Sequence, residues 1–212
     1  MMSVSSTSKV GGETAGAGTG LEPGAGPGTG LEPGVGAGPG AGADPGSGPA
    51  SVLVRGEGEG PGTWALGSLF ERLASGEETG GGFALSLVTQ PPGAATPVHI
   101  HTLEDEAFYL LDGTMTYSAD GELHRLARGS FIFLRRGLPH AFRVTGDAPV
   151  RFLAIASPGA LMSLYDEVGR PAGGHELPPP DQEQLMADVH RWLETAPRYG
   201  LSIVGPPLPA DV

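Results

Sequence analysis

Short apolar segments that alternate with turn signals are the feature that most constrains the fold of this chain. They recur at intervals of about ten residues, a spacing typical of all-β domains. The candidate strands are 52–54, 64–70, 83–89, 97–101, 106–111, 114–118, 122–127, 130–134, 140–145 and 150–156. Glycine turns such as Asp112-Gly113 and Asp120-Gly121 separate most of them, and Asp120-Gly121 suits a tight hairpin. This pattern favours an all-β sandwich or barrel.

The pattern changes in the last quarter of the chain. Residues 159–168 and 181–195 carry apolar side chains at helical spacing. Asp181, followed three residues later by Gln184, resembles a capping box at the start of the second of these segments. We therefore expect a β core followed by a C-terminal helical segment.

The first fifty residues have a different composition. Glycine and proline dominate this stretch, it lacks aromatic residues, and GTGLEPG occurs at 18–24 and again at 28–34. Such a segment buries too little apolar surface to offset the entropy of ordering it. We expect residues 1–50 to be a disordered tail and residues 51–212 to form one folded domain.

Composition excludes several functions. The net charge is −12, with 12 Lys and Arg residues and no basic cluster, which argues against nucleic acid or an anionic membrane as a partner. The chain has no cysteine, so thiolate metal sites and cysteine nucleophiles are excluded. The sequence shows neither a signal peptide nor an apolar run long enough to span a membrane. A cytoplasmic location is the resulting expectation.

The stretch PVHIHTLEDEAFYLLDG, residues 97–113, contains the strongest chemical signal. His99 and His101 are two residues apart, so in a strand their side chains lie on the same face and can bind one metal ion. Glu106 begins the next apolar run and could turn its carboxylate toward them. His140, which follows a turn and begins another strand, is the candidate third histidine.

These residues resemble the two sequence motifs of the cupin family. Gly93, His99, His101, Glu106 and Gly113 fill every position of the first motif. In the second motif Gly129, Gly137 and His140 match, whereas Arg135 replaces the usual Pro and Val144 the usual Asn. The resemblance covers about residues 83–156 and implies a cupin-type β-barrel, also called a double-stranded β-helix or jelly-roll. Across about 160 residues, the sequence resembles most the single-domain, quercetin 2,3-dioxygenase-like cupins of actinomycete type.

The resemblance implies a metal-dependent dioxygenase acting on a flavonol or similar small phenolic, with dioxygen as the second substrate. It implies one divalent transition metal ion (Fe, Ni, Co, Mn, Zn or Cu) bound by His99, His101, Glu106 and His140. Glu106 would be both ligand and general base. Many cupins are homodimers, so a homodimer is a candidate assembly. Two alternatives stay open: another metal-dependent reaction such as isomerisation or cyclisation, and a non-catalytic metal- or ligand-binding cupin.

Other polar and aromatic residues have simpler interpretations. Glu104 and Asp105 are interpreted as a solvated acidic connection, and Arg135 and Arg136 as rim charges. We expect solvated side chains at His124, His175 and His190. The aromatic residues expected in the core are Trp64, Phe70, Phe83, Tyr109 and Phe142.

Overall fold

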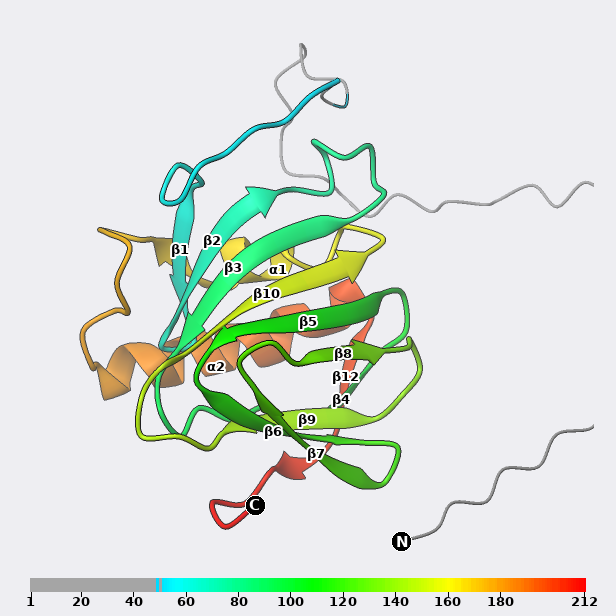
Figure 1. Ribbon diagram of the computed structural model, residues 1–212, viewed down its shortest axis with the longest axis vertical. Helices are drawn as coiled ribbons and strands as arrows, with labels where there is room; N and C mark the ends of the chain where they lie inside the picture. Colours follow the sequence, from blue (N-terminus) through cyan, green and yellow to red (C-terminus); the bar gives the residue numbers. More distant parts are fainter. Residues whose placement is uncertain (1–48, 50) are drawn as a thin grey trace, which may run out of the picture. The chain divides into compact units, whose positions relative to one another are not determined.

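A computed structural model describes Pro49 and residues 51–212 of the chain (Figure 1). The prediction of disorder for residues 1–50 falls outside the described residues, apart from Pro49, and stays a prediction.

Two antiparallel sheets form the fold. The first has seven strands in the order β11-β1-β2-β3-β10-β5-β8, and the second has five in the order β12-β4-β9-β6-β7. The strands of the first sheet are β1 (Gly62–Ala65), β2 (Ser68–Ala74), β3 (Ala84–Gln90), β5 (Asp105–Asp112), β8 (Phe131–Leu134), β10 (Val150–Ser157) and β11 (Arg170–Pro171). Those of the second are β4 (Pro97–His101), β6 (Thr114–Ala119), β7 (Glu122–Ala127), β9 (His140–Val144) and β12 (Leu201–Pro207).

The core lies between the two sheets. Along β10, for example, Phe152, Ala154 and Ala156 are buried while the residues between them are partly exposed, as the alternation of side chains in a strand requires. Tyr117 of β6 packs against Phe108 of β5 and Phe142 of β9 with ring centroids 5.4 Å apart in both pairs. These contacts join the inner faces of both sheets, so the predicted all-β jelly-roll is confirmed.

Two of the predicted strands differ from the structure. The stretch 64–70 is a hairpin of β1 and β2, because Leu66 and Gly67 both have positive φ and reverse the chain. The stretch 52–54 is not a strand, and the side chains of Val52 and Val54 are exposed. The strand at 52–54 was predicted from apolar residues alone, but this segment does not pair with either sheet.

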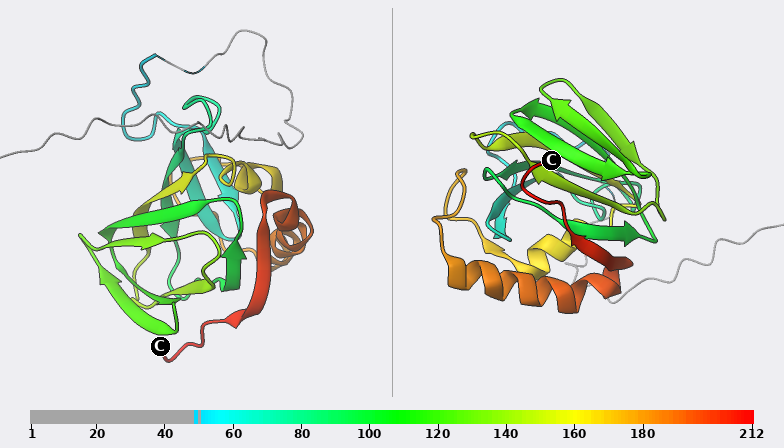
Figure 2. Two further views of the ribbon diagram at one scale, coloured as in Figure 1. Left: turned by 90° about the vertical axis from the view of Figure 1, so that its right-hand side faces the viewer. Right: turned by 90° about the horizontal axis from the view of Figure 1, so that it is seen from below.

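The helical segment joins the two sheets at their edges (Figure 2). Helix α1 (Ser163–Val168) packs on β1, while α2 (Gln182–Thr195) continues through the 3-10 helix η1 (Ala196–Tyr199) into β12. The predicted cap is present, since the Asp181 side chain accepts a hydrogen bond from the Gln184 N–H at 2.9 Å. Trp192 of α2 belongs to the buried core, and no helix in the described part of the chain is long and apolar enough to cross a membrane.

Candidate metal centre

The four predicted ligand residues lie together inside the sandwich. The donor atoms of His99, His101, Glu106 and His140 are all within 4.8 Å of one another, and all four side chains are buried. His99 and His101 come from β4 and point inward together, because they are two residues apart in one strand. His140 of β9 lies opposite His99 in the strand register. Glu106 reaches the group from β5 of the other sheet.

The spacing of the donor atoms fits a single metal ion. The Glu106 Oε2 atom is 3.2 Å from His101 Nε2 and 3.3 Å from His140 Nε2. Two ligand atoms that each lie about 2.1 Å from one ion are about 3.0–3.4 Å apart at angles between 90° and tetrahedral. Three imidazoles and one carboxylate therefore form a donor set that could bind one first-row transition metal ion.

Backbone carbonyls orient two of the histidines. His99 Nδ1 is 2.8 Å from the carbonyl oxygen of Pro97, and His140 Nδ1 is 2.9 Å from that of Leu138. A carbonyl oxygen only accepts hydrogen bonds, so each Nδ1 atom carries a proton, and in the neutral form of each ring the lone pair is on Nε2. The fold thus fixes the tautomer that a metal site needs before any ion is bound.

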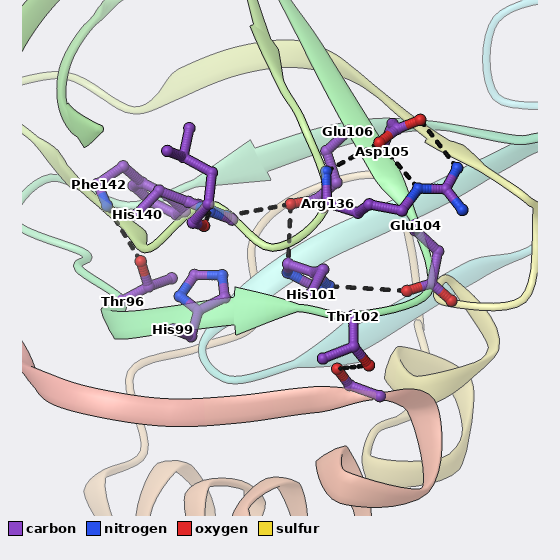
Figure 3. A network of polar contacts seen from close by, with 12 residues as sticks. Thr96, His99, His101, Thr102, Glu104, Asp105, Glu106, Arg136, His140 and Phe142 are labelled. Atoms are coloured by element: carbon purple, nitrogen blue, oxygen red, sulfur yellow. Dashed lines mark hydrogen bonds and ion pairs between the residues drawn. The ribbon is translucent and has the colours of Figure 1, made fainter. Parts of the chain in front are cut away.

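Beside His101, the group that faces Nδ1 is the side chain of Glu104 instead of a backbone carbonyl. The Nδ1 atom of His101 and the Oε2 atom of Glu104 are both buried without a hydrogen-bond partner, and they face each other at 3.9 Å (Figure 3). The Glu104 side chain is only 1% exposed, so its interpretation as a solvated acid was wrong. Nothing in the local pattern predicts this burial, which arises because the connection between β4 and β5 turns inward. Its neighbour Asp105 does face the surface, where it pairs with Arg136 at 2.9 Å.

Burial sets the protonation states of the group. Desolvation, reinforced by the neighbouring His140 charge, lowers the pKa of His99 to about 4, and desolvation also lowers the pKa of His101. Burial opposes ionisation of Glu106, but the hydrogen bond from His140 and the nearby imidazoles together keep its pKa below the ordinary value. Near neutral pH, His99 and His101 are therefore neutral and Glu106 is ionised, which are the forms that bind a metal.

Burial and the Glu106 charge have the opposite effect on Glu104. They raise the pKa of this carboxyl from its ordinary 4.5 to about 7. Its protonation state therefore changes close to neutral pH in the protein without a bound cation.

A small cavity adjoins the four residues. Its volume is about 40 Å³, and six of its 14 lining residues are Phe or Tyr, including Phe70, Phe108 and Phe142. Since one water needs about 10–15 Å³ by this measure, the cavity has room for only a few water-sized groups. Tyr165 of α1 lies on its wall and stacks on Phe70 at 4.2 Å, so the helical segment closes this side of the site.

Two buried polar atoms in the cavity wall lack partners. The Tyr117 hydroxyl and the Gln90 side-chain oxygen make no hydrogen bond, although both residues line the cavity. Buried polar groups nearly always have a partner, so these atoms indicate where a ligand or ordered water would bind.

The remaining histidines lie away from the site. His190 is exposed and His124 is partly exposed, as expected. His175 is exposed as well, and its Nδ1 lies 2.9 Å from the carboxylate of Glu71. Among the expected core aromatics, Phe70 and Phe142 are buried, whereas Phe83 and Tyr109 are each 42% exposed, so for these two the prediction was wrong.

Comparison with known proteins identifies the family. The cupin domain profile matches residues 86–156, a stretch that includes all four candidate ligands. Together with the jelly-roll fold and the buried histidine–glutamate group, this match places the chain in the cupin superfamily.

Individual relatives match only parts of the chain. It is 30% identical over 124 residues to quercetin 2,3-dioxygenase of Bacillus subtilis, covering 58% of this chain and 36% of that protein. It is 33% identical over 67 residues to the tetracenomycin polyketide synthase protein TcmJ of Streptomyces glaucescens, covering 32% of this chain and 45% of that protein. A predicted oxalate decarboxylase from Thermotoga maritima superposes with a TM-score of 0.45 at 23% identity, over 50% of this chain and 98% of that one. The chain thus spans less than half the length of these two curated relatives.

Proposed function

We propose that this protein is a metal-dependent cupin enzyme, a dioxygenase acting on a flavonol or a similar small phenolic. The observation that carries the proposal is the buried group of three imidazoles and one carboxylate with donor atoms within 4.8 Å of one another. The partial similarity to quercetin 2,3-dioxygenase supports the choice of reaction.

A divalent metal ion bound by His99, His101, Glu106 and His140 would supply Lewis acidity that lowers the pKa of a substrate hydroxyl. Glu106 is the residue placed to take that hydroxyl proton. It is ionised near neutral pH, and its Oε2 atom lies 3.2 Å from His101 Nε2 and 3.3 Å from His140 Nε2. His99 and His140 keep their orientation through the hydrogen bonds to Pro97 and Leu138.

The side chains that line the cavity have two further roles. Its aromatic side chains exclude bulk water, which strengthens every electrostatic interaction inside. The Tyr117 hydroxyl can donate to a substrate oxygen, and the Gln90 side-chain oxygen can accept from a substrate hydroxyl. A phenolic ligand with both kinds of group would satisfy both atoms.

The cavity size gives the proposal a definite structural requirement. Sites for ligands with several rings are about 300–1,000 Å³ in volume, far larger than the 40 Å³ here. A flavonol can enter only if Tyr165 and Met162, which lie on the cavity wall, move away with the helical segment. A single-ring phenol needs less movement.

The small cavity also favours a second candidate function. In this alternative the same residues serve another metal-dependent reaction of a smaller ligand, or bind such a ligand without turnover. The match to a polyketide synthase protein makes phenolic polyketide fragments suitable probes for it.

Oxygen consumption by the metal-loaded full chain tests the proposal. Quercetin and single-ring catechols are compared as substrates, with Glu106→Gln as the variant that keeps the side-chain shape and removes the base. We expect oxygen uptake with a phenolic that is lost in Glu106→Gln. Binding of phenolics without oxygen uptake would favour the second candidate, and absence of both would contradict the proposal.

A further inference from the structure

A second, larger cavity lies between the hairpin of β1 and β2 and the start of α2. Its volume is about 580 Å³, and it shares no lining residue with the cavity beside the four candidate ligands. The loop of residues 172–181, which joins β11 to α2 and runs beside β1, forms another wall (Figure 1). We call this cavity the hairpin groove; its lining includes Trp64, Arg170, Leu177, Gln182, Leu185 and Asp188. Small-molecule sites usually have volumes of about 300–1,000 Å³, so the groove has room for one.

Most of the groove wall is apolar and held in place. Leu177, Leu185 and the three consecutive prolines at 178–180 line it. Proline fixes φ and has no N–H, so this wall is stiff and presents ring surface instead of hydrogen-bond donors. The loop is tied to β1, because Trp64 Nε1 donates a hydrogen bond to the Glu176 carbonyl oxygen at 2.9 Å. An apolar ligand would therefore meet a preformed surface.

Among the described residues that line the hairpin groove, only Arg170 is basic. Its guanidinium makes no hydrogen bond within the described part of the chain, because the nearest acid, Asp188, lies 4.0 Å away. The guanidinium carbon lies 5.6 Å from the centre of the Trp64 ring. Stacking of this kind uses the flat face of the guanidinium and leaves the N–H groups at its edge free. Arg170 thus offers unused donors to the groove.

The acid nearest to Arg170 has other partners. Asp188 is only 1% exposed, and its carboxylate accepts hydrogen bonds from the Leu66 N–H and the Gln184 side-chain amide. It also accepts a hydrogen bond from the Arg191 guanidinium at 2.5 Å. Because Arg191 balances the charge of Asp188, the positive charge of Arg170 remains available to an anion.

We propose that the hairpin groove binds a small aromatic monocarboxylate, with its carboxylate on Arg170 and its ring against the apolar wall. A guanidinium presents paired N–H donors that match a carboxylate, and such bonds are stronger than neutral hydrogen bonds. The flat surfaces of Trp64 and the prolines suit an aromatic ring. Asp181 and Asp188 also line the groove, and they disfavour ligands with two or more negative charges. The proposal does not depend on which reaction the metal centre performs.

Calorimetric titration of the full chain with 2-naphthoate tests the proposal. Neutral 2-naphthamide, which has nearly the same shape, measures the contribution of the carboxylate. Arg170→Gln removes the guanidinium, and Gln182→Glu adds a negative charge to the groove at an exposed position without a change of shape. The matched control Arg125→Gln makes the same charge change as Arg170→Gln on an exposed residue of β7, in the other sheet.

A fourth variant separates the groove from the metal centre. A carboxylate can also coordinate a metal ion, so His99→Ala/His101→Ala reports any binding there. Circular dichroism verifies that each variant is folded. Gln182→Glu changes one exposed side chain, so it keeps the test valid even if Arg170→Gln should unfold.

We expect one 2-naphthoate per chain with a dissociation constant of about 1 mM or lower, the affinity that ordinary ligand efficiency gives for this size. The constant should rise about 10- to 100-fold in Arg170→Gln and several-fold in Gln182→Glu. It should stay unchanged in Arg125→Gln and in the His99/His101 variant, and 2-naphthamide should bind at least about tenfold more weakly. Absence of binding overturns the proposal, as does equal affinity in Arg170→Gln and its control, or binding that only the His99/His101 variant loses.

Discussion

Replacing Glu104 by Gln should stabilise the metal-free protein and weaken metal binding. Burial raises the pKa of the Glu104 carboxyl from 4.5 to about 7, so the folded protein favours its protonated form. The stabilising contribution of that form is fully present below pH 4.5 and is lost as the pH rises through 7. Above both values the buried carboxylate costs about 3 kcal/mol, since one pKa unit corresponds to about 1.4 kcal/mol. Glutamine has nearly the same shape and does not ionise.

Urea unfolding of the metal-free proteins at pH 4.5 and pH 8 measures this cost. We expect equal free energies of unfolding at pH 4.5, and at pH 8 a value for Glu104→Gln up to about 3 kcal/mol higher than for the unmodified protein. The control is Glu122→Gln, an exposed residue of β7, which makes the same change in net charge.

The same variant should bind metal more weakly. The Glu104 carboxylate faces His101 Nδ1 at 3.9 Å, and loss of such a neighbour typically lowers metal affinity about 10- to 100-fold. Titration of the metal-free proteins with Zn²⁺ or Ni²⁺ against a competing chelator measures this. The reasoning is refuted if Glu104→Gln behaves like Glu122→Gln in both assays.

Three further predictions concern the histidine group and the cavity. The pKa of His99 lies near 4 instead of 6.5, so the metal-free protein should lose up to about 3 kcal/mol of stability as the pH falls from 6.5 to 4. In urea unfolding, His99→Gln should make the stability depend less on pH over this range. Tyr117→Phe removes a buried hydroxyl without a partner, so thermal unfolding should show equal or higher stability. The affinity for phenol, measured by calorimetry, should fall several-fold. A loss of stability would mean that the hydroxyl has a partner within the protein. Tyr165→Ala, which removes the stacking on Phe70, should accelerate flavonol binding in stopped-flow fluorescence more than binding of a single-ring phenol; equal acceleration would place the entrance elsewhere.

The sequence was sufficient to predict the four residues of the candidate site. In a strand, side chains two residues apart share a face, so His99 and His101 had to point the same way wherever the strand lay. The contributions of Glu106 and His140 came from the motif resemblance, because no local pattern relates β4 to β5 or β9. Turn glycines placed most of the strands correctly, for example β7 at Glu122–Ala127.

Features that depend on tertiary packing were not predictable. Glu104 and Asp105 are adjacent acids in one short connection, yet the first is buried beside His101 and the second pairs with Arg136 at the surface. The strand β12 was missed because it forms a strand only by pairing with β4, which lies far earlier in the chain. Tyr109 was assigned to the core because aromatic residues are usually buried, whereas the register places it on the outer face of the sheet.

Metal content per chain tests the central claim most directly. The full chain is purified without a histidine tag and compared by elemental analysis with His99→Ala/His101→Ala and with the control His124→Ala/His190→Ala, which removes two histidines outside the site. We predict about one first-row transition metal ion per chain in the unmodified protein and the control, and none in the His99/His101 variant. A protein that binds no metal even after reconstitution, or equal metal content in all three proteins, would contradict the assignment of this group as a metal centre.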